Sequence, residues 1–427
     1  MARDAPAWRP ARLGDAVVAG VLLLMIGLLA GRPDVALLGV PALVAAVFSL
    51  TRRPPLPQVI AEQPTPDASG GLDSTLRISG GELAHVRASA VGQRTAEFVA
   101  DIPKGSEREV ELRLASVRTG PQQTAVADVR GYDGWWEHDP RSVGGTTRLV
   151  LPASMRLGLV PVPHNLRGLT GPRVSRRFGD GGELRDIHPF VPGDRLKRID
   201  WRTTARRSPN LETLYVRRTF ADAEAAVVLV VDSRDDIGPD LRTWRGFSEQ
   251  RVDEATSLDL ARHAAASIAR ALVEHGDRVG LVDLALETRP VPPASGRRHL
   301  RRVLHGLALA HPVGQPSARV RPPQVPADAL VYLFSTVLDD AAAQLVRTWR
   351  RLGHPVVLID TLPDVRPVRE PYLAIARRII RIERDLRLDG LAREGVPVVH
   401  WAGPARSAAA ASLDSLARVA ARKRDWR

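Results

Sequence analysis

The residues of this chain that could do chemistry are concentrated in one basic segment, and they favour recognition over catalysis. Residues 167–218 hold thirteen basic and six acidic side chains. Guanidinium groups bind carboxylates and phosphates through paired hydrogen bonds, so the segment fits an acidic surface or a phosphorylated ligand. Nothing in it pairs a nucleophile with a base, and the chain contains no P-loop, G-x-S-x-G or H-E-x-x-H pattern. We therefore predict no catalytic site.

Two adjoining motifs lie in the middle of this segment. The first, Pro192-Gly193-Asp194, predicts a tight turn, because proline fixes φ, glycine permits a positive φ and aspartate accepts a backbone N–H. A short helix is expected next, with Arg198, Trp201 and Arg202 on one side. The candidate site residues are Pro192, Gly193, Asp194, Arg198, Asp200, Trp201, Arg202 and Arg206.

Two interpretations of these residues stay open. As a structural clasp, Asp194 and Asp200 would neutralise buried arginines while Trp201 fills the joint between two domains. As a docking surface, the tryptophan and the arginines would instead face a partner protein. We expect a division of roles, in which Trp201 belongs to a core and Arg202 contacts the partner.

Two apolar runs, 17–30 and 35–50, stand ahead of the domains that must position this segment. A Gly-Arg-Pro-Asp turn separates them. We predict a transmembrane helical hairpin over 1–51; a signal peptide and a buried soluble hairpin are the alternatives. Arginines flank the pair of runs on both outer sides, which predicts an inner or plasma membrane location with both termini and the soluble domains in the cytoplasm. A chain without cysteine agrees with a reducing compartment.

Three further parts follow the hairpin and a proline-rich tether at 52–72. Short alternating stretches with glycine and proline between them predict a β-sandwich over 73–165. The basic linker motif occupies 166–220. From 221 to 427, continuous apolar strands alternate with amphipathic helices, which predicts a doubly wound α/β domain with a mostly parallel sheet. Its strands are expected at 225–231, 278–284, 329–334, 355–359 and 396–400, and its helices at 257–275, 298–309, 341–352 and from the alanine-rich stretch to 422.

The overall charge does not by itself indicate a nucleic-acid ligand. The 427 residues carry a net charge of +13, yet only three of the 61 basic residues are lysines, Lys104, Lys197 and Lys423. Such an arginine bias arises from GC-rich coding without any ligand, so we do not expect nucleic acid as the partner.

The motif region resembles a bacterial protein family called domain of unknown function 58. Its members carry a pattern like P-G-D-x-x-R-x-I-D-W-x-x-x-A-R ahead of a von Willebrand factor A-like domain. Every element is present here: Pro192, Gly193, Asp194, Arg198, Ile199, Asp200, Trp201, Ala205 and Arg206. The resemblance implies a membrane-anchored protein encoded beside a MoxR-type AAA ATPase.

The function expected from the resemblance is that of an interaction or scaffold protein. It would bind a MoxR-like AAA ATPase and couple it to the maturation or remodelling of a client protein, and the hairpin would contact the lipid bilayer. The alternative is an enzyme or binder that uses the arginine-rich motif on a phosphorylated or nucleic-acid ligand. In that case Asp194 and Asp200 would act together with the arginines.

The resemblance to von Willebrand factor A-like domains also implies a possible metal site in the loop after the first strand. In such domains an Asp-x-Ser-x-Ser motif in this loop supplies oxygen ligands to Mg²⁺ or Ca²⁺. This chain has Asp232 and Asp236 at the first and last positions, but Arg234 lies between them. Ser335-Thr336 stands where another aspartate is expected. We expect Arg234 to pair with Asp232 in place of an ion, so no cofactor is predicted; Mg²⁺ or Ca²⁺ held by Asp232 and Asp236 is the alternative.

Overall fold

The computed structural model divides the chain into two compact units, residues 1–150 and 151–427. It describes residues 8–10, 13–51, 58–61, 65–66, 72–79, 83–89, 96–101, 106–114, 118–123, 126–133, 136–138, 141–144, 147–166, 171–245, 254–285, 290–313, 322–402 and 406–425. Each unit is considered by itself.

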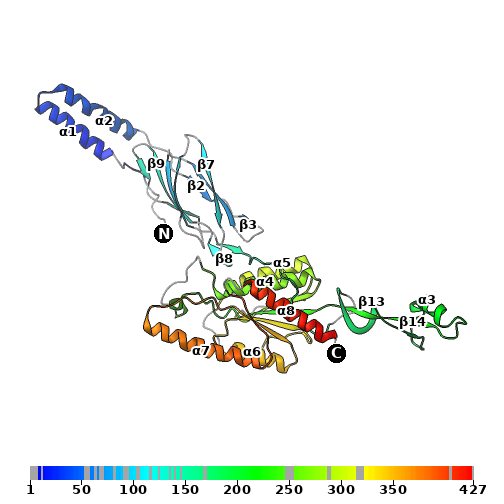
Figure 1. Cartoon of the computed structure of the whole chain (residues 1–427). Coiled ribbons are helices and arrows are strands. Elements are labelled where there is room, and N and C mark those ends of the chain that lie inside the picture. The colour runs from blue at the N-terminus through cyan, green and yellow to red at the C-terminus, as the bar shows by residue number, and fades with distance from the viewer. Residues whose placement is uncertain are drawn as a thin grey trace. The chain divides into compact units, whose positions relative to one another are not determined.

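The first unit begins with the predicted helical hairpin. Helix α1 (Leu13–Leu29) and helix α2 (Pro33–Thr51) are antiparallel neighbours (Figure 1). Glycines let their backbones approach closely: a side chain at Gly27 would collide with the backbone of Ala36, and one at Gly39 with the carbonyl oxygen of Gly20.

The transmembrane part of that prediction is wrong. Helix α1 has 17 residues and α2 has 19, at the short end of the lengths that span a bilayer. Within the described residues no helix combines the length and the hydrophobicity that a membrane crossing requires. The predicted membrane location, with its cytoplasmic termini, is corrected by the same finding.

Antiparallel sheets make up the rest of the described part of the first unit. One sheet has the order β1-β10-β9-β5-β6 with β11 beside β9, a second has the order β2-β4-β3 with β7 beside β4, and β8 pairs with β12. Side chains buried in these sheets include Leu76, Ile78, Ala84, Val86 and Val129. Strands β2 and β3 lie within the predicted tether, so part of that proline-rich stretch joins a sheet. The bounds are β1 Trp8–Pro10, β2 Gln58–Ala61, β3 Thr65–Pro66, β4 Leu72–Ser79, β5 Leu83–Ser89, β6 Ala96–Asp101, β7 Glu107–Leu114, β8 Gly120–Gln123, β9 Val126–Asp133, β10 Trp136–His138, β11 Arg141–Gly144 and β12 Thr147–Val150.

The second unit is built on a six-stranded sheet with the order β17-β16-β15-β18-β19-β20. All neighbours are parallel except the edge strand β17. This confirms the α/β class with a mostly parallel sheet. The strands are β15 Ala226–Val231, β16 Arg278–Asp283, β17 Val291–Ala294, β18 Leu330–Ser335, β19 Val356–Asp360 and β20 Val398–His400, and the helices between and after them are α4 Ser257–Glu274, α5 Arg297–Leu309, α6 Asp340–Arg351, α7 Pro371–Arg393 and α8 Arg406–Asp425.

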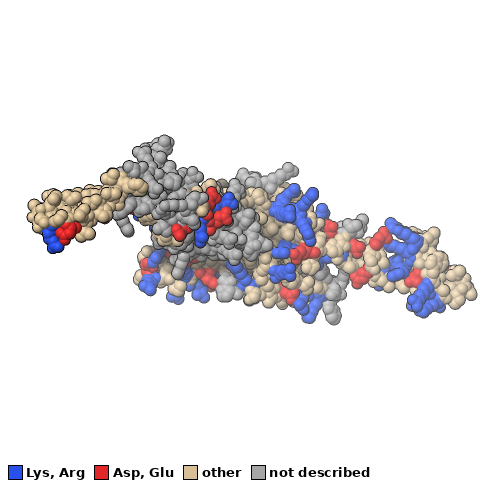
Figure 2. Space-filling view, turned by 90° about the horizontal axis from the view of Figure 1, so that it is seen from above, with Lys and Arg blue, Asp and Glu red and all other residues tan. Residues whose placement is uncertain are grey.

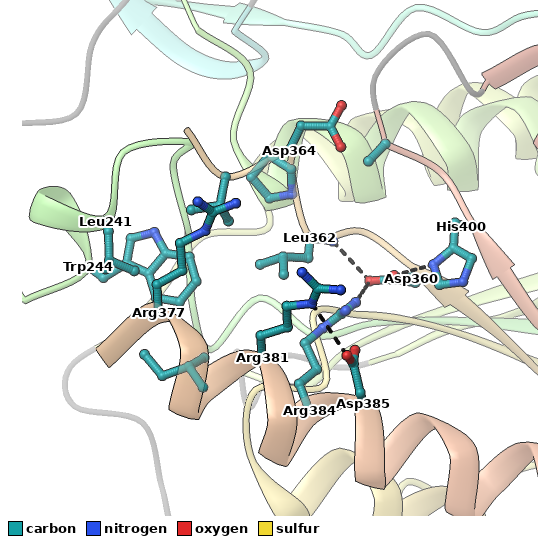
Figure 3. A pocket seen from close by; sticks show the side chains of 14 residues that line it. Leu241, Trp244, Asp360, Leu362, Asp364, Arg377, Arg381, Arg384, Asp385 and His400 are labelled. Atoms are coloured by element: carbon teal, nitrogen blue, oxygen red, sulfur yellow. Dashed lines mark hydrogen bonds and ion pairs between the residues drawn. The ribbon is translucent and has the colours of Figure 1, made fainter. Parts of the chain in front are cut away.

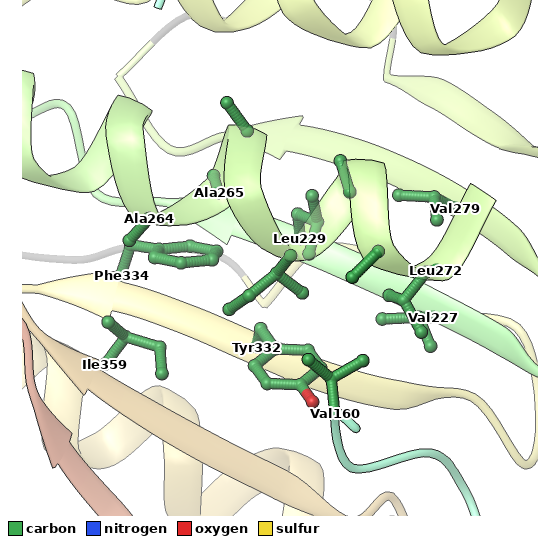
Figure 4. Close-up of a cluster of buried hydrophobic side chains, with 14 of the residues drawn as sticks. Val160, Val227, Leu229, Ala264, Ala265, Leu272, Val279, Tyr332, Phe334 and Ile359 are labelled. Carbon is green, nitrogen blue, oxygen red and sulfur yellow. The ribbon is translucent and has the colours of Figure 1, made fainter. Parts of the chain in front are cut away.

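Helices cover both faces of this sheet, and each face has its own core. Alternate residues of β15 separate them: Val227 and Leu229 pack with α4, α5 and α8, whereas Val228 and Val230 pack with α6 and α7. Figure 1 shows these two helical layers, and Figure 4 shows the first core around Leu229 and Tyr332. A sheet buried on both faces explains why its strands are continuously apolar.

The segment 151–166 belongs to the second unit, although the sequence predicted it as the end of the sandwich. Val160, Val162 and Leu166 are part of the core that α4 covers. The hydroxyl of the fully buried Tyr332 donates to the carbonyl oxygen of Pro161 over 2.7 Å. Burial of residues 151–166, called the strap below, therefore contributes to the stability of the α/β domain.

A long two-stranded ribbon leaves the α/β domain just ahead of β15. Strands β13 (Arg173–Pro189) and β14 (Tyr215–Ala223) are antiparallel with several register shifts. At its base, Arg173 forms two hydrogen bonds, 2.6 and 2.7 Å long, with the buried carboxylate of Asp277. The other end, between β13 and β14, holds a 3-10 helix (Leu196–Arg198) and helix α3 (Trp201–Arg207) (Figure 1).

Candidate functional site

The strand order defines one place in the α/β domain where polar side chains converge. The chain passes from β15 to β16 in one direction along the sheet and from β18 to β19 in the other, so the carboxyl ends of β15 and β18 border a topological switch point, where doubly wound proteins bind ligands. Asp232 follows β15, Ser335 ends β18, Asp360 ends β19 and His400 ends β20.

At this switch point Arg234 links two aspartates. Its guanidinium binds both carboxylate oxygens of Asp232, over 2.7 and 2.8 Å, and that of Asp339 over 2.8 Å. The hydroxyl of Ser335 donates to the same Asp232 carboxylate over 2.7 Å. Burial would lower the pKa of the Arg234 guanidinium, but its hydrogen bonds with Asp232 and Asp339 outweigh burial and raise it. The arginine is therefore permanently charged.

These residues do not fit a divalent cation. The guanidinium of Arg234 fills the space between Asp232 and Asp339, where its charge would repel the ion. Asp236 lies half-buried in the following loop, and among the described residues no group of three or more acidic or histidine side chains could hold a metal. The predicted pairing of Arg234 with Asp232 is present in the structure.

The backbone beside this network is strained. Val337, which is fully buried, has a φ of +54°, a conformation that a β-branched residue rarely adopts. Its amide donates to the hydroxyl of Ser335 over 3.2 Å, and Ser335 in turn binds Asp232. Such strain persists only where the surroundings over-determine it, and it is concentrated at functional sites.

Beside the switch point, the ends of β19 and β20 open into a cavity of about 370 Å³. Figure 3 shows the carboxylate of Asp360 at its floor, between the imidazole of His400 and the guanidinium of Arg384. The distance from His400 Nδ1 to Asp360 Oδ2 is 2.5 Å. Arg384 also donates from Nε to the carbonyl oxygen of Thr336 over 2.8 Å, which ties this cavity to the end of β18.

The buried carboxylate and the imidazole alter one another's protonation. Asp360 is only 4% exposed, and although burial raises its pKa, hydrogen bonds from His400 and Arg384 lower it overall. The hydrogen bond to Asp360 raises the pKa of His400, whose side chain is 63% exposed. An imidazole with Nδ1 held by a carboxylate is oriented to use its other nitrogen, Nε2, as a donor or acceptor.

The rest of the cavity wall combines arginines with apolar side chains. Arg377, Arg381 and Arg384 line it from one side of α7, while Leu241 and Trp244 face them from the 3-10 helix Leu241–Arg245 (Figure 3). The indole N–H of Trp244 donates to Gly238 over 2.9 Å, which holds the ring in place.

The sequence prediction missed this cavity because it placed no element between β19 and β20. A signal for α7 was nevertheless present. Tyr372, Ile375, Ile379, Ile382 and Leu386 repeat with alternating spacings of three and four, and Pro371 stands at the first helical turn. Arg377 and Arg384 lie on the opposite side of that helix, seven residues apart.

The Pro192-Gly193-Asp194 motif forms the predicted turn at the end of the ribbon. Gly193 has a φ of +106°, and Asp194 accepts the backbone N–H of Val191 over 3.0 Å. His188 Nε2 lies 3.4 Å from the same Asp194 carboxylate. This aspartate stabilises a turn, and the one arginine it pairs with among the described residues, Arg218 at 3.8 Å, is only partly buried.

The second motif forms the predicted short helix, but with Trp201 in solvent. Asp200 is the N-cap of α3 and accepts the backbone N–H of Thr203 over 2.9 Å. This backbone hydrogen bond is the main cause that lowers the pKa of Asp200. Trp201 is 62% exposed. The expectation that Trp201 belongs to a core is wrong, because the two-stranded ribbon has no second layer to cover it.

Two of the motif arginines are exposed and one is not. Arg198 donates to the carbonyl oxygen of Gly179 over 2.8 Å and pairs with Asp180, so it fixes α3 to the ribbon. Arg202 and Arg206 are exposed and form no hydrogen bond or ion pair with the residues that the structure describes. Figure 2 shows arginine and lysine side chains gathered on this ribbon, at the right of the view.

Comparison with known proteins identifies the family. Over 247 residues the chain is 32% identical to the uncharacterized proteins Mb1516 of Mycobacterium bovis and Rv1480 of Mycobacterium tuberculosis, which covers 56% of this chain and 67% of each of those proteins. Residues 186–366 match the model of the protein family of unknown function DUF58. The chain belongs to this family. A more distant relative is the uncharacterized Bacillus subtilis protein YeaD, 26% identical over 125 residues, or 29% of this chain and 26% of YeaD.

The DUF58 match covers only part of the candidate site. It includes both ribbon motifs and the network around Arg234, and it ends before α7, so the cavity arginines lie outside it. No solved structure matches the chain.

Proposed function

We propose that this chain is an interaction protein that binds a protein partner through the end of its β13–β14 ribbon. The observation that carries the proposal is the exposed indole of Trp201 with Arg202 and Arg206 beside it. Exposed tryptophan and arginine side chains are the types that contribute most binding energy at protein interfaces. Leu196, 68% exposed, adds apolar surface next to them.

The partner that the family resemblance favours is a MoxR-type AAA ATPase, which the chain would couple to the maturation or remodelling of a client. The basic ribbon supports this by charge, because a surface with exposed arginines selects a partner with an acidic patch. We infer further that the α/β domain is of the von Willebrand factor A-like type. A parallel sheet covered on both faces, with Asp232 after its first strand, supports that assignment.

The alternative, an enzyme that uses Asp194 and Asp200 on a phosphorylated substrate, receives less support. Both carboxylates accept backbone N–H groups of their own turn or helix, so each has a local structural role. Neither aspartate pairs with the exposed arginines Arg202 and Arg206.

The test measures binding of the full chain to the purified MoxR-type ATPase of the same organism, with ATP, with ADP and without nucleotide. We expect Trp201→Ala and Arg202→Ala each to weaken binding at least tenfold, with unchanged melting curves. Leu352→Ala removes a similarly exposed apolar side chain at the end of α6 and serves as the control. Unchanged binding by both ribbon variants, or no binding in any nucleotide state, would contradict the proposal.

A further inference from the structure

We propose that the cavity at the ends of β19 and β20 binds a phosphate monoester that carries an apolar or ring-shaped group. The cavity of about 370 Å³ lies within the range of small-molecule sites, which are mostly apolar with a few convergent polar groups. The site is separate from the ribbon and from the function proposed for it.

The charges around the cavity leave cations available for an anion. The guanidinium of Arg384 forms an ion pair with Asp360 and donates a hydrogen bond to the carbonyl oxygen of Thr336, so its charge is already neutralised. Arg377, by contrast, is half-buried and has no ion-pair or hydrogen-bond partner in the part of the chain that the structure describes. An oxyanion in the cavity would give the N–H donors of this guanidinium a charged partner.

Two more groups complete the anion site. Among the described residues Arg381 pairs with Asp385 alone, at 3.6 Å, which is longer than a hydrogen bond and leaves its donors free to turn toward a ligand. His400 uses Nδ1 for Asp360, while Nε2 forms no hydrogen bond with the described residues. Asp364 also lines the cavity, but Figure 3 shows its carboxylate directed away from Arg381. The geometry thus offers two guanidinium groups and one imidazole to an oxyanion.

The apolar wall indicates the rest of the ligand. Trp244 lies beside Arg377, and Leu362 lies in the middle of the cavity (Figure 3). Ile380 lines the cavity from α7. An inorganic anion would leave this surface uncovered, whereas a ring attached to the phosphate would bury it.

The experiment titrates phenyl phosphate, inorganic phosphate and benzoate into the full-length chain by isothermal titration calorimetry. We expect phenyl phosphate to bind at least tenfold more tightly than either of the others. Arg377→Gln and Arg381→Gln should each weaken its binding about tenfold, as for a lost charged hydrogen bond. Arg393→Gln changes an exposed arginine of the same helix that does not line the cavity, and it should bind as the unchanged chain does.

The variants are chosen so that folding does not decide the result. Neither Arg377 nor Arg381 forms a hydrogen bond within the described residues, so both variants should melt at the unchanged temperature. Benzoate bound as tightly as phenyl phosphate would overturn the phosphate assignment. No binding of phenyl phosphate at millimolar concentration, or equal binding by the Arg377→Gln variant, would overturn the site itself.

The exposed side of α7 carries a second, independent inference. Tyr372, Ile375, Ile379, Ile382 and Leu386 follow the 3-4 spacing of a coiled-coil seam, and each is more than half exposed. The opposite side of the helix faces its own domain, where Leu391 is fully buried. We infer that this stripe packs against the same stripe of a second copy of the chain.

Charge complementarity selects a second copy as the occupant. With Tyr372 and Ile379 at a positions and Ile375 and Ile382 at d positions, Arg378 falls at g. In a parallel pair Arg378 meets Glu383 of the other copy, and in an antiparallel pair it meets Asp385. Either arrangement forms two opposite-charge contacts by symmetry.

Absence of cysteine from the chain makes a clean crosslinking test possible. Under mild oxidation, full-length Ile379→Cys and Ile382→Cys should form disulfide-linked dimers, whereas Ala374→Cys, exposed but beside the stripe, should not. Adding Ile375→Glu should abolish the crosslink at Ile382→Cys, because a charge in the seam opposes pairing. Equal crosslinking at all three positions, or a monomer by sedimentation equilibrium, would overturn the inference.

Discussion

Arg234 is the residue on which the polar network at the strand ends depends. Its side chain is 4% exposed and binds two carboxylates, of which Asp232 is itself buried with 9% exposure. A buried ion pair contributes little by itself, but removal of one partner leaves an uncompensated charge. The same guanidinium prevents the loop from offering Asp232 to a cation.

We expect Arg234→Ala to lower the free energy of unfolding by about 3 to 5 kcal/mol. Urea denaturation measures it. Arg242→Ala is the control, because Arg242 and its partner Glu370 are both substantially exposed, and it should cost less than about 1 kcal/mol. Adding Asp232→Asn to Arg234→Ala should recover part of the loss. A single variant as stable as the unchanged chain would contradict this account of the network.

His263 gives the α/β core a pH dependence. Burial lowers the pKa of this imidazole to about 4, and its Nδ1 accepts the indole N–H of the fully buried Trp401 over 3.1 Å. Protonation of Nδ1 would remove that acceptor. Because the folded-state pKa lies below the ordinary value, stability is full above pH 6.5 and is lost as the pH falls toward the folded-state pKa.

The expected loss between pH 6.5 and pH 4 is at most roughly 3 kcal/mol. Urea denaturation at a series of pH values measures it. His263→Gln cannot take up a proton and should flatten this part of the profile, whereas His305→Gln should not. A profile of equal slope in the chain with and without His263 would exclude this imidazole as the cause.

The ribbon is the element in which structural and interaction residues are most clearly separated. Asp194, Arg198 and Asp200 hold its turn and its short helix, whereas Trp201, Arg202 and Arg206 are exposed. A two-stranded ribbon has no core of its own, so its shape depends on such local hydrogen bonds.

Substitutions in α3 should therefore act locally. Asp200→Ala removes an N-cap and should destabilise the helix by about 1 kcal/mol, far less than the loss of a buried ion pair. Hydrogen exchange should show it as faster exchange of the Thr203 amide. Trp201→Ala should change the melting temperature by less than a degree or so, since large losses come from buried tryptophans. A drop of many degrees for Trp201→Ala would show that the indole is covered.

At the scale of the whole molecule, the boundary at Val150 separates two units that each have buried residues of their own. The strap 151–166 precedes the ribbon in sequence yet lies within the α/β core. Stability of the second unit should therefore depend on residues that come well before its first sheet strand.

A fragment of residues 151–427 should fold alone and melt cooperatively. A fragment of residues 167–427 lacks Val160, Val162 and Leu166, and it leaves the buried Tyr332 hydroxyl without the Pro161 carbonyl. Because buried apolar surface and a buried hydrogen bond are lost together, we expect it to melt at a much lower temperature or to stay unfolded. Calorimetry of the two fragments checks this, and equal melting would show that the strap is dispensable.

Hydrophobic periodicity by itself predicted most of the α/β domain. The strand expected at 225–231 and the helix expected at 257–275 agree with β15 and α4 to within one residue at each end. Continuous apolar strands carry that information because burial on both faces leaves no place for polar residues. Turn chemistry likewise predicted the positive φ of Gly193, and residue charge predicted the pairing of Arg234 with Asp232.

Only the tertiary structure decided which side chains are exposed and which meet. Trp201 is of a type that is usually buried, and it is exposed because nothing packs on the ribbon's end. Asp360, Arg384 and His400 come from three successive elements, and the packing of α7 and the parallel register of β19 and β20 bring them together. The spacing of residues in a sequence predicts which side chains share a face of one strand or helix. A cavity between elements depends instead on strand order and helix packing, and local residue spacing does not determine these.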